Sequence, residues 1–212
     1  MRKIDRLMRE ILGKYYSQGT RFFNQKSIAK SCSLSLGTVN PTIIKFEQIG
    51  AVERRPLGFR LTDPKRLLLY WAATRELSKD IVYTTFSPTK IEKIEEELRE
   101  MGQLTAYSAY RLTFGSTPVE YSQVFVYASP ELIERKFRPT RAKKRNIFVL
   151  TPDEHLRAMS KNGIVPIVQA YVDLWQLGAP ASRLVEDLEK KLATVTAKTV
   201  EEVAKALKQE KE

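Results

Sequence analysis

The sequence contains very little cysteine and histidine. Its 212 residues include a single cysteine, Cys32, and a single histidine, His155. One cysteine excludes a disulfide framework within the chain, and two residues are too few for a zinc site of four Cys and His ligands. We therefore expect no metal and no cofactor. Cys32 is predicted to be a small buried residue, and His155 a surface residue rather than a catalytic base.

Long apolar runs are also missing. No stretch reaches the roughly 18 apolar residues that span a bilayer, and the first twelve residues carry charges throughout, unlike a signal peptide. Hydrophobic residues make up 42% of the chain, which is enough for a core in one or two domains. These features predict a cytoplasmic protein without a membrane partner. Scarce Cys and His beside abundant Lys, Arg and Glu are typical of archaeal and thermophile proteins.

Acidic residues are scarce in the first third of the chain. Residues 1–71 hold 14 Lys and Arg but 5 Asp and Glu, whereas residues 72–212 hold 22 and 20. Most of the net charge of +11 therefore lies in the first third. Such a concentration is the electrostatic footprint expected for a nucleic-acid phosphate backbone. A generic basic surface, or one attracted to anionic lipid, is the alternative.

The same third shows a recognisable order of elements. Residues 3–16 are predicted to form an amphipathic helix, and the cations Arg2, Lys3, Arg6 and Arg9 lie away from its apolar face. A short helix should follow the N-cap Asn24, and a longer one should run from the N-cap Ser35 to Gly50. Two short strands at 51–55 and 59–61 and a helix at 65–75 complete the series. Helix, helix, turn, helix and β-hairpin is the order of a winged helix-turn-helix.

The helix after Ser35 has an unusual exposed face. At 100° per residue, Val39, Ile43 and Phe46 form a core face. The opposite side is nearly uncharged, which is typical of a helix that lies in a DNA groove. Pro41 interrupts the helical hydrogen bonding, and Gly37 four residues earlier offers little side-chain obstruction to it.

Residues 35–53 resemble the recognition helix and wing entry of PadR-type and MarR-like regulators. This resemblance implies a homodimer on double-stranded DNA, with the helix reading bases and the wing contacting the backbone or minor groove. The predicted DNA contacts on the helix are Ser35, Thr38, Asn40, Ile44, Lys45 and Gln48, and those on the wing are Arg54, Arg55 and Arg60.

The rest of the chain alternates short strands and helices. Strands are predicted at 81–86, 123–128 and 146–150, and helices at 89–101, 104–112, 166–177, 182–193 and 197–209. The acidic run Glu95-Glu96-Glu97 is interpreted as a solvated helix face. We therefore expect an α+β protein: an N-terminal winged helix-turn-helix (1–75), then a small mixed α+β domain with C-terminal helices (76–212).

A basic segment at residues 135–145 holds seven cations and no acid. It is either a second nucleic-acid contact or a solvated hairpin tip. The predicted contacts are Arg138, Arg141, Lys143, Lys144 and Arg145.

No catalytic residues are predicted. Gly115-Ser116 before the strand at 123–128 resembles the nucleotidyltransferase Gly-Ser turn, but that family needs paired carboxylates on the strand, and this strand has none. A degenerate nucleotidyltransferase-like protein is the most that this resemblance implies. The chain is therefore not expected to be an enzyme.

The stretches 165–175 and 183–188, with Gln-x-Tyr-x-Asp-Leu-Trp at 169–175, resemble the C-terminal region of AbiEi-type antitoxins and archaeal relatives. That resemblance implies a repressor of its own operon that also counters a toxin. The alternative is a buried helix with Val168, Tyr171, Val172, Leu174 and Trp175 inside.

The sequence therefore predicts a sequence-specific DNA-binding transcriptional regulator. A stripe of Val200, Val203, Ala204 and Leu207 is the predicted dimer surface. One alternative is a module that binds a toxin-like protein and has little affinity for DNA. The other is the degenerate nucleotidyltransferase.

Overall fold

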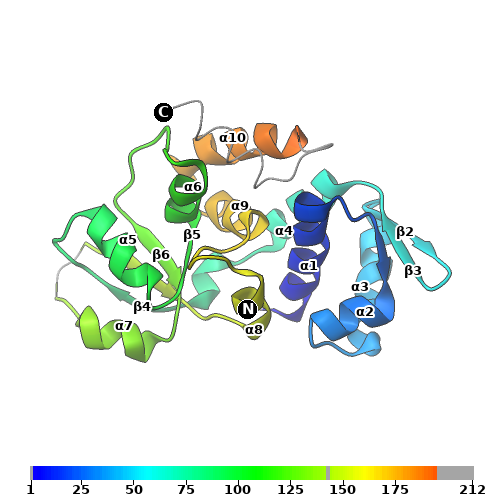
Figure 1. Ribbon diagram of the computed structural model, residues 1–212, viewed down its shortest axis with the longest axis horizontal. Helices are drawn as coiled ribbons and strands as arrows, with labels where there is room; N and C mark the ends of the chain where they lie inside the picture. Colours follow the sequence, from blue (N-terminus) through cyan, green and yellow to red (C-terminus); the bar gives the residue numbers. More distant parts are fainter. Residues whose placement is uncertain (1, 142–143, 195–212) are drawn as a thin grey trace.

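A computed structural model describes residues 2–141 and 144–194, and they form a mixed α+β fold (Figure 1). The N-terminal elements are α1 (Lys3–Gln18), β1 (Phe22–Asn24), α2 (Gln25–Ser31), α3 (Leu36–Gln48), β2 (Val52–Arg55), β3 (Gly58–Leu61) and α4 (Pro64–Thr74). The following elements are η1 (Leu77–Asp80), β4 (Ile81–Thr85), α5 (Ile91–Arg99), β5 (Gln103–Thr105), α6 (Ala106–Phe114), β6 (Val124–Tyr127), α7 (Pro130–Lys136), β7 (Ile147–Leu150), α8 (Glu154–Met159), α9 (Ile167–Trp175) and α10 (Ala181–Ala193).

The N-terminal hairpin belongs to a three-stranded antiparallel sheet of order β1-β3-β2. The strand β1 was not expected from the sequence, because three residues are too few to show an alternating pattern. It exists because Phe23 pairs with Phe59 of β3, and their buried rings stack with centroids 5.4 Å apart. The β-carbon that Gly58 lacks would lie 2.2 Å from the Phe23 carbonyl oxygen, so this close pairing requires glycine.

The helices α2 and α3 form the predicted pair joined by a tight turn. The Asn24 side chain caps α2 by accepting hydrogen bonds from the amides of Lys26 and Ser27. Cys32 in the turn is fully buried, as predicted. The core face of α3 is confirmed, because the side chains of Val39, Ile43 and Phe46 are inaccessible to solvent.

The second sheet has the order β4-β7-β6-β5, with β6 and β7 parallel and the two edge strands antiparallel. Successive residues of a strand point to opposite faces. Phe125 and Tyr127 accordingly join the core beneath α6 and α9, whereas Val124 and Val126 join a second core beneath α5 and α7. Helices cover both faces, which explains why β6 is apolar without alternation.

Several sequence predictions about this half were wrong. The predicted helix at 104–112 begins as the strand β5, which pairs with β6. Glu95 does not belong to a solvated face: its side chain is 1% exposed because it accepts hydrogen bonds from Arg111 and Tyr121. Trp175 is 41% exposed at the end of α9, although its predicted companions in that helix are buried.

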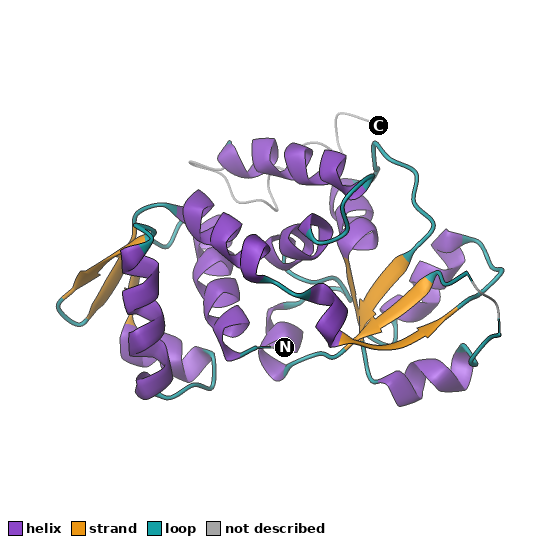
Figure 2. Ribbon diagram, turned by 180° about the vertical axis from the view of Figure 1, so that it is seen from behind, coloured by secondary structure: helices purple, strands orange, loops and turns teal. Residues whose placement is uncertain are grey.

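The N-terminal helices pack directly on the C-terminal half. α1 and α4 both contact α9, and α9 also contacts α6 and α10, so one apolar core runs through both halves. In Figure 1 α1, α4 and α9 lie at the centre of the molecule, with the hairpin at one end and the mixed sheet at the other. The view from behind in Figure 2 shows the same separation of the two sheets. The division into domains near residue 75 stays a prediction.

Within residues 2–141 and 144–194, no helix is both long and apolar enough to cross a membrane. The predicted helix at 197–209, with its stripe of Val200, Val203, Ala204 and Leu207, lies outside the described residues.

Candidate nucleic-acid interface

The solvent-facing side of α3 brings together most of the predicted helix contacts. Asn40, Lys45 and Gln48 are exposed, and Thr38 and Ile44 are partly exposed beside them. Ser35 is also exposed, and its hydroxyl lies 3.1 Å from that of Thr38, so these two side chains satisfy each other. Pro41 lies inside the helix on this face. The face thus offers amide, hydroxyl and apolar groups with one cation.

One salt bridge links α3 to the hairpin. Glu47 is the only acidic residue of α3, and its carboxylate accepts hydrogen bonds from the Arg54 backbone amide at 3.2 Å and from Arg54 Nε at 2.5 Å. These bonds and the positive charge of Arg54 lower the pKa of Glu47 from its usual value. The only negative charge of α3 is therefore engaged by the neighbouring strand.

The hairpin carries its other two arginines on the opposite face. Glu53 pairs in register with Arg60, and Arg55 lies two residues beyond Glu53, so all three share one side. Arg55 forms an ion pair of 2.8 Å with Glu53. Among the described residues, Arg60 has no ion-pair partner. The three predicted wing residues are therefore all exposed, but Arg54 faces α3 while Arg55 and Arg60 face away.

The helix α2 adds positive charge beside α3. Lys26 and Lys30 are exposed, and α2 packs against α3. Neither lysine forms an ion pair within the part of the chain that the structure describes. Together with Lys45 and the hairpin arginines, they make this end of the molecule cationic. Sequence reasoning had not selected these two lysines, although the charge count of the first third includes them.

The basic segment at 135–145 lies elsewhere. It begins in α7 and continues in the connection to β7, at the far end of the long axis from the hairpin in both views (Figures 1 and 2). Arg138, Arg141 and Lys144 are exposed and Arg145 is partly exposed. Lys143 lies outside the described residues. This segment and α3 are therefore not parts of one continuous surface.

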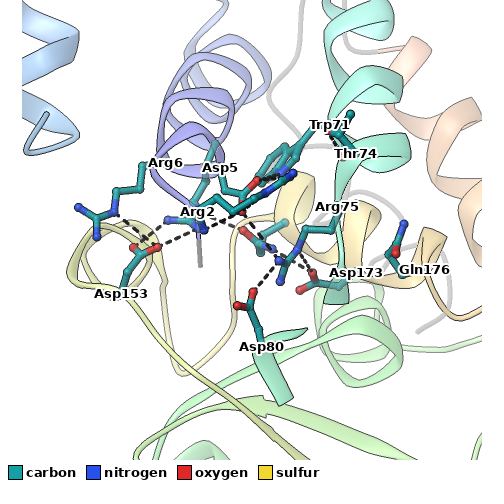
Figure 3. Close-up of polar contacts among 12 residues, drawn as sticks. Arg2, Asp5, Arg6, Trp71, Thr74, Arg75, Asp80, Asp153, Asp173 and Gln176 are labelled. Atoms are coloured by element: carbon teal, nitrogen blue, oxygen red, sulfur yellow. Dashed lines mark hydrogen bonds and ion pairs between the residues drawn. The ribbon is translucent and has the colours of Figure 1, made fainter. Parts of the chain in front are cut away.

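A buried polar cluster joins α4 to the C-terminal half (Figure 3). Arg75 directly follows α4, is 3% exposed, and donates to Asp173 at 3.2 Å, to Asp80 at 2.6 Å and to the Tyr127 hydroxyl at 2.9 Å. Asp173 also accepts hydrogen bonds from Thr105, Tyr127 and Gln169. Burial raises the pKa of Asp173, against the opposing effect of Arg75.

The polar residues of the Gln-x-Tyr-x-Asp stretch at 169–173 belong to this cluster. Gln169 and Asp173 lie one turn apart on α9, and both side chains are fully buried in the cluster. The only signal for them in the sequence was the presence of two polar residues on an otherwise apolar helix. Their partners come from four other segments, which no local pattern reveals.

Two further sequence predictions fail at the contact of α1 with α8. His155 was predicted at the surface but is 8% exposed, and Arg9, assigned to the polar positions of α1, is fully buried. Arg9 donates to Gln169 Oε1 at 2.9 Å, to Asp153 Oδ1 at 3.0 Å and to His155 Nδ1 at 3.0 Å. Arginine only donates, so Nδ1 accepts and His155 Nε2 donates to Glu10 at 2.9 Å. These partners explain how charged side chains are buried here.

The lowered pKa of Glu10 should make the stability of the protein depend on pH in the acid range. Burial alone would raise the pKa of Glu10, but hydrogen bonds from His155 and Lys14 and the positive charge of Lys14 lower it to about 2. The resulting stabilisation is complete above the ordinary pKa of 4.5 and is lost as the pH falls from there towards 2. We expect Glu10→Gln to cost up to about 3 kcal/mol at pH 7 and to make stability fall less steeply below pH 4.5.

Urea unfolding of both proteins between pH 2 and 7 measures this difference. Glu96→Gln, at an exposed position of α5, is the matched control and should follow the wild-type curve. If the free energy of unfolding fell equally steeply with pH in the Glu10 variant and in the wild type, Glu10 would not contribute to the loss of stability in acid.

A hollow of about 580 Å³ lies over α5, lined by Glu92, Glu95, Glu96, Arg99, Glu100, Arg111, Leu112 and Asn162. Among the described residues, no three His, Cys, Asp or Glu side chains are grouped so that they could hold a metal ion. Strand β6 contributes only buried residues and no carboxylate.

Comparison with known proteins returns no matching family model, no similar curated protein and no similar solved structure.

Proposed function

We propose that the protein is a sequence-specific DNA-binding transcriptional regulator, with residues 1–75 acting as a winged helix-turn-helix. The observation that carries this proposal is the exposed face of α3, whose only carboxylate, that of Glu47, is paired with Arg54 in a salt bridge. Cations of α2 and the hairpin flank that face. A polyanion can therefore approach α3 without electrostatic repulsion.

The residue types on α3 suit the major groove. Asn40 and Gln48 carry amides that can pair with adenine, and Ile44 can contact a thymine methyl group. Arg54, Arg55 and Arg60 on the hairpin are suited to phosphates, which set position rather than sequence. We further propose that two copies bind a two-fold symmetric site and act in the cytoplasm without catalytic activity.

The AbiEi-type resemblance supports a narrower proposal, that of a repressor of its own operon. The stretch that carries it is largely in the core, because Gln169, Tyr171 and Asp173 are buried. A toxin-like partner would therefore contact other surfaces. Binding to such a partner without any affinity for DNA is the alternative function.

Fluorescence anisotropy with the DNA upstream of the coding sequence tests the main proposal. Binding should weaken steeply with salt, and specific DNA should bind at least about a thousandfold more tightly than random duplex. Equal affinity for both would contradict sequence-specific regulation. An absence of binding at low salt would favour the protein-partner alternative.

The two basic regions can be distinguished with matched triple variants. The first variant replaces Arg54, Arg55 and Arg60 by alanine. We expect it to weaken binding to a 20-bp duplex similarly for specific and random sequences, and to reduce the salt slope by about 3. The second variant replaces Arg138, Arg141 and Lys144 by alanine and removes the same charge at the opposite end of the molecule. It should leave the affinity and the salt slope unchanged. A reduced slope in the second variant alone would move the interface to the basic segment.

A further inference from the structure

The turn of the hairpin has an unusual residue at its tip. Pro56 and Leu57 connect β2 to β3, and the Leu57 side chain is 84% exposed, more than any other large apolar residue among those described. A single exposed leucine is common on protein surfaces and by itself indicates nothing. Leu57 differs from an ordinary exposed leucine in its backbone conformation.

Leu57 has a φ of 69°, in the left-handed region. Proline at the first central position and a positive φ at the second are typical of a type II turn, in which glycine or asparagine usually occupies the second position. A leucine there is strained by contact of its β-carbon with the backbone. Strain of this kind is concentrated at functional positions. The positive φ at position 57 thus favours glycine, yet the residue there is a leucine.

The surrounding residues hold this tip in place. The Asn24 side-chain amide donates to the Leu57 carbonyl at 3.0 Å, although the two residues are 33 positions apart. The next residue, Gly58, is buried, and the position that a β-carbon would take there lies close to both the Phe23 carbonyl oxygen and the ring of Phe22. The backbone of the tip is therefore anchored to β1 and to the start of α2.

The hairpin carries Arg54, Arg55 and Arg60 behind this apolar tip, and the Arg54–Glu47 salt bridge joins it to α3. An apolar side chain ahead of cations is the arrangement by which proteins enter the DNA minor groove, where a wedge between two base pairs partly unstacks them and kinks the duplex. A protein partner would be less compatible with three arginines around a single exposed leucine.

We propose that Leu57 is a minor-groove wedge, so that the protein bends the DNA it binds. The proposal rests on the DNA-binding function proposed above and adds a deformation of the DNA to it. Pyrimidine–purine steps such as TA unstack most easily. Leu57 would therefore favour sites with such a step where the hairpin reaches the duplex, and would contribute specificity without a hydrogen bond to a base.

Energy transfer between dyes at the two ends of a 30-bp upstream duplex measures the bend. We expect wild-type protein and Leu57→Met to shorten the end-to-end distance, and Leu57→Gly to bind without shortening it and with about 3- to 10-fold lower affinity. The midpoint of thermal unfolding should rise in Leu57→Gly, because glycine relieves the strain at positive φ. A folded, more stable variant that loses bending would support the wedge.

Bending by Leu57→Gly equal to that by the wild type would overturn the wedge, as would binding by the wild type without any bend. In both cases the DNA-binding function would stand. If the wild type did not bind the duplex at all, the proposed function and the wedge would both be rejected.

Discussion

Replacing Arg75 by methionine should lower the free energy of unfolding by about 3 to 5 kcal/mol, the range for breaking one partner of a buried ion pair. The physical reason is that Asp173 and Asp80 would keep their buried carboxylates and lose the cation that both contact. For a chain of this size the midpoint of thermal unfolding should fall by roughly 6 to 20 °C. Urea unfolding followed by circular dichroism measures the effect.

Two further variants make this result interpretable. Arg66→Met removes an exposed arginine paired with Asp63 and should cost less than about 1 kcal/mol. Combining Arg75→Met with Asp173→Asn should restore part of the lost stability, because the remaining buried charge is then reduced. A cost below about 1 kcal/mol for Arg75→Met would contradict the role assigned to the cluster.

Removing the side-chain amides of Asn40 and Gln48 on α3 should abolish most of the discrimination between specific and random DNA. We expect the double variant Asn40→Ala, Gln48→Ala to lose roughly 30- to 25,000-fold in affinity for specific DNA, since each lost base contact costs about 1 to 3 kcal/mol. Affinity for random duplex should change less than about threefold, because the phosphate-binding cations are retained. Competition anisotropy with both duplexes gives the ratio.

Gln18→Ala is the matched control for this experiment. Gln18 is an exposed amide at the end of α1 and is not among the predicted base contacts, so its loss should leave the ratio unchanged. If the double variant also kept the wild-type ratio, Asn40 and Gln48 would not read bases and the interface would have to be placed on another surface.

The sequence by itself determined the local features of the N-terminal part. The apolar spacing of Val39, Ile43 and Phe46 predicted which face of α3 is buried, and Asn24 predicted where α2 begins. The excess of cations in residues 1–71 indicated the charged end. These predictions succeed because helical periodicity, capping and net charge depend on residues that are close together in the chain.

Only the tertiary structure decided which charged residues are buried and which surfaces are continuous. Arg9, His155 and Glu95 each have a pattern typical of the surface, and each is buried because a partner from a distant segment compensates its polarity. The basic segment at 135–145 was predicted as a second contact, but its position opposite α3 follows from packing alone. Burying a charge is favourable only when a specific partner is supplied, and a local sequence pattern does not identify that partner.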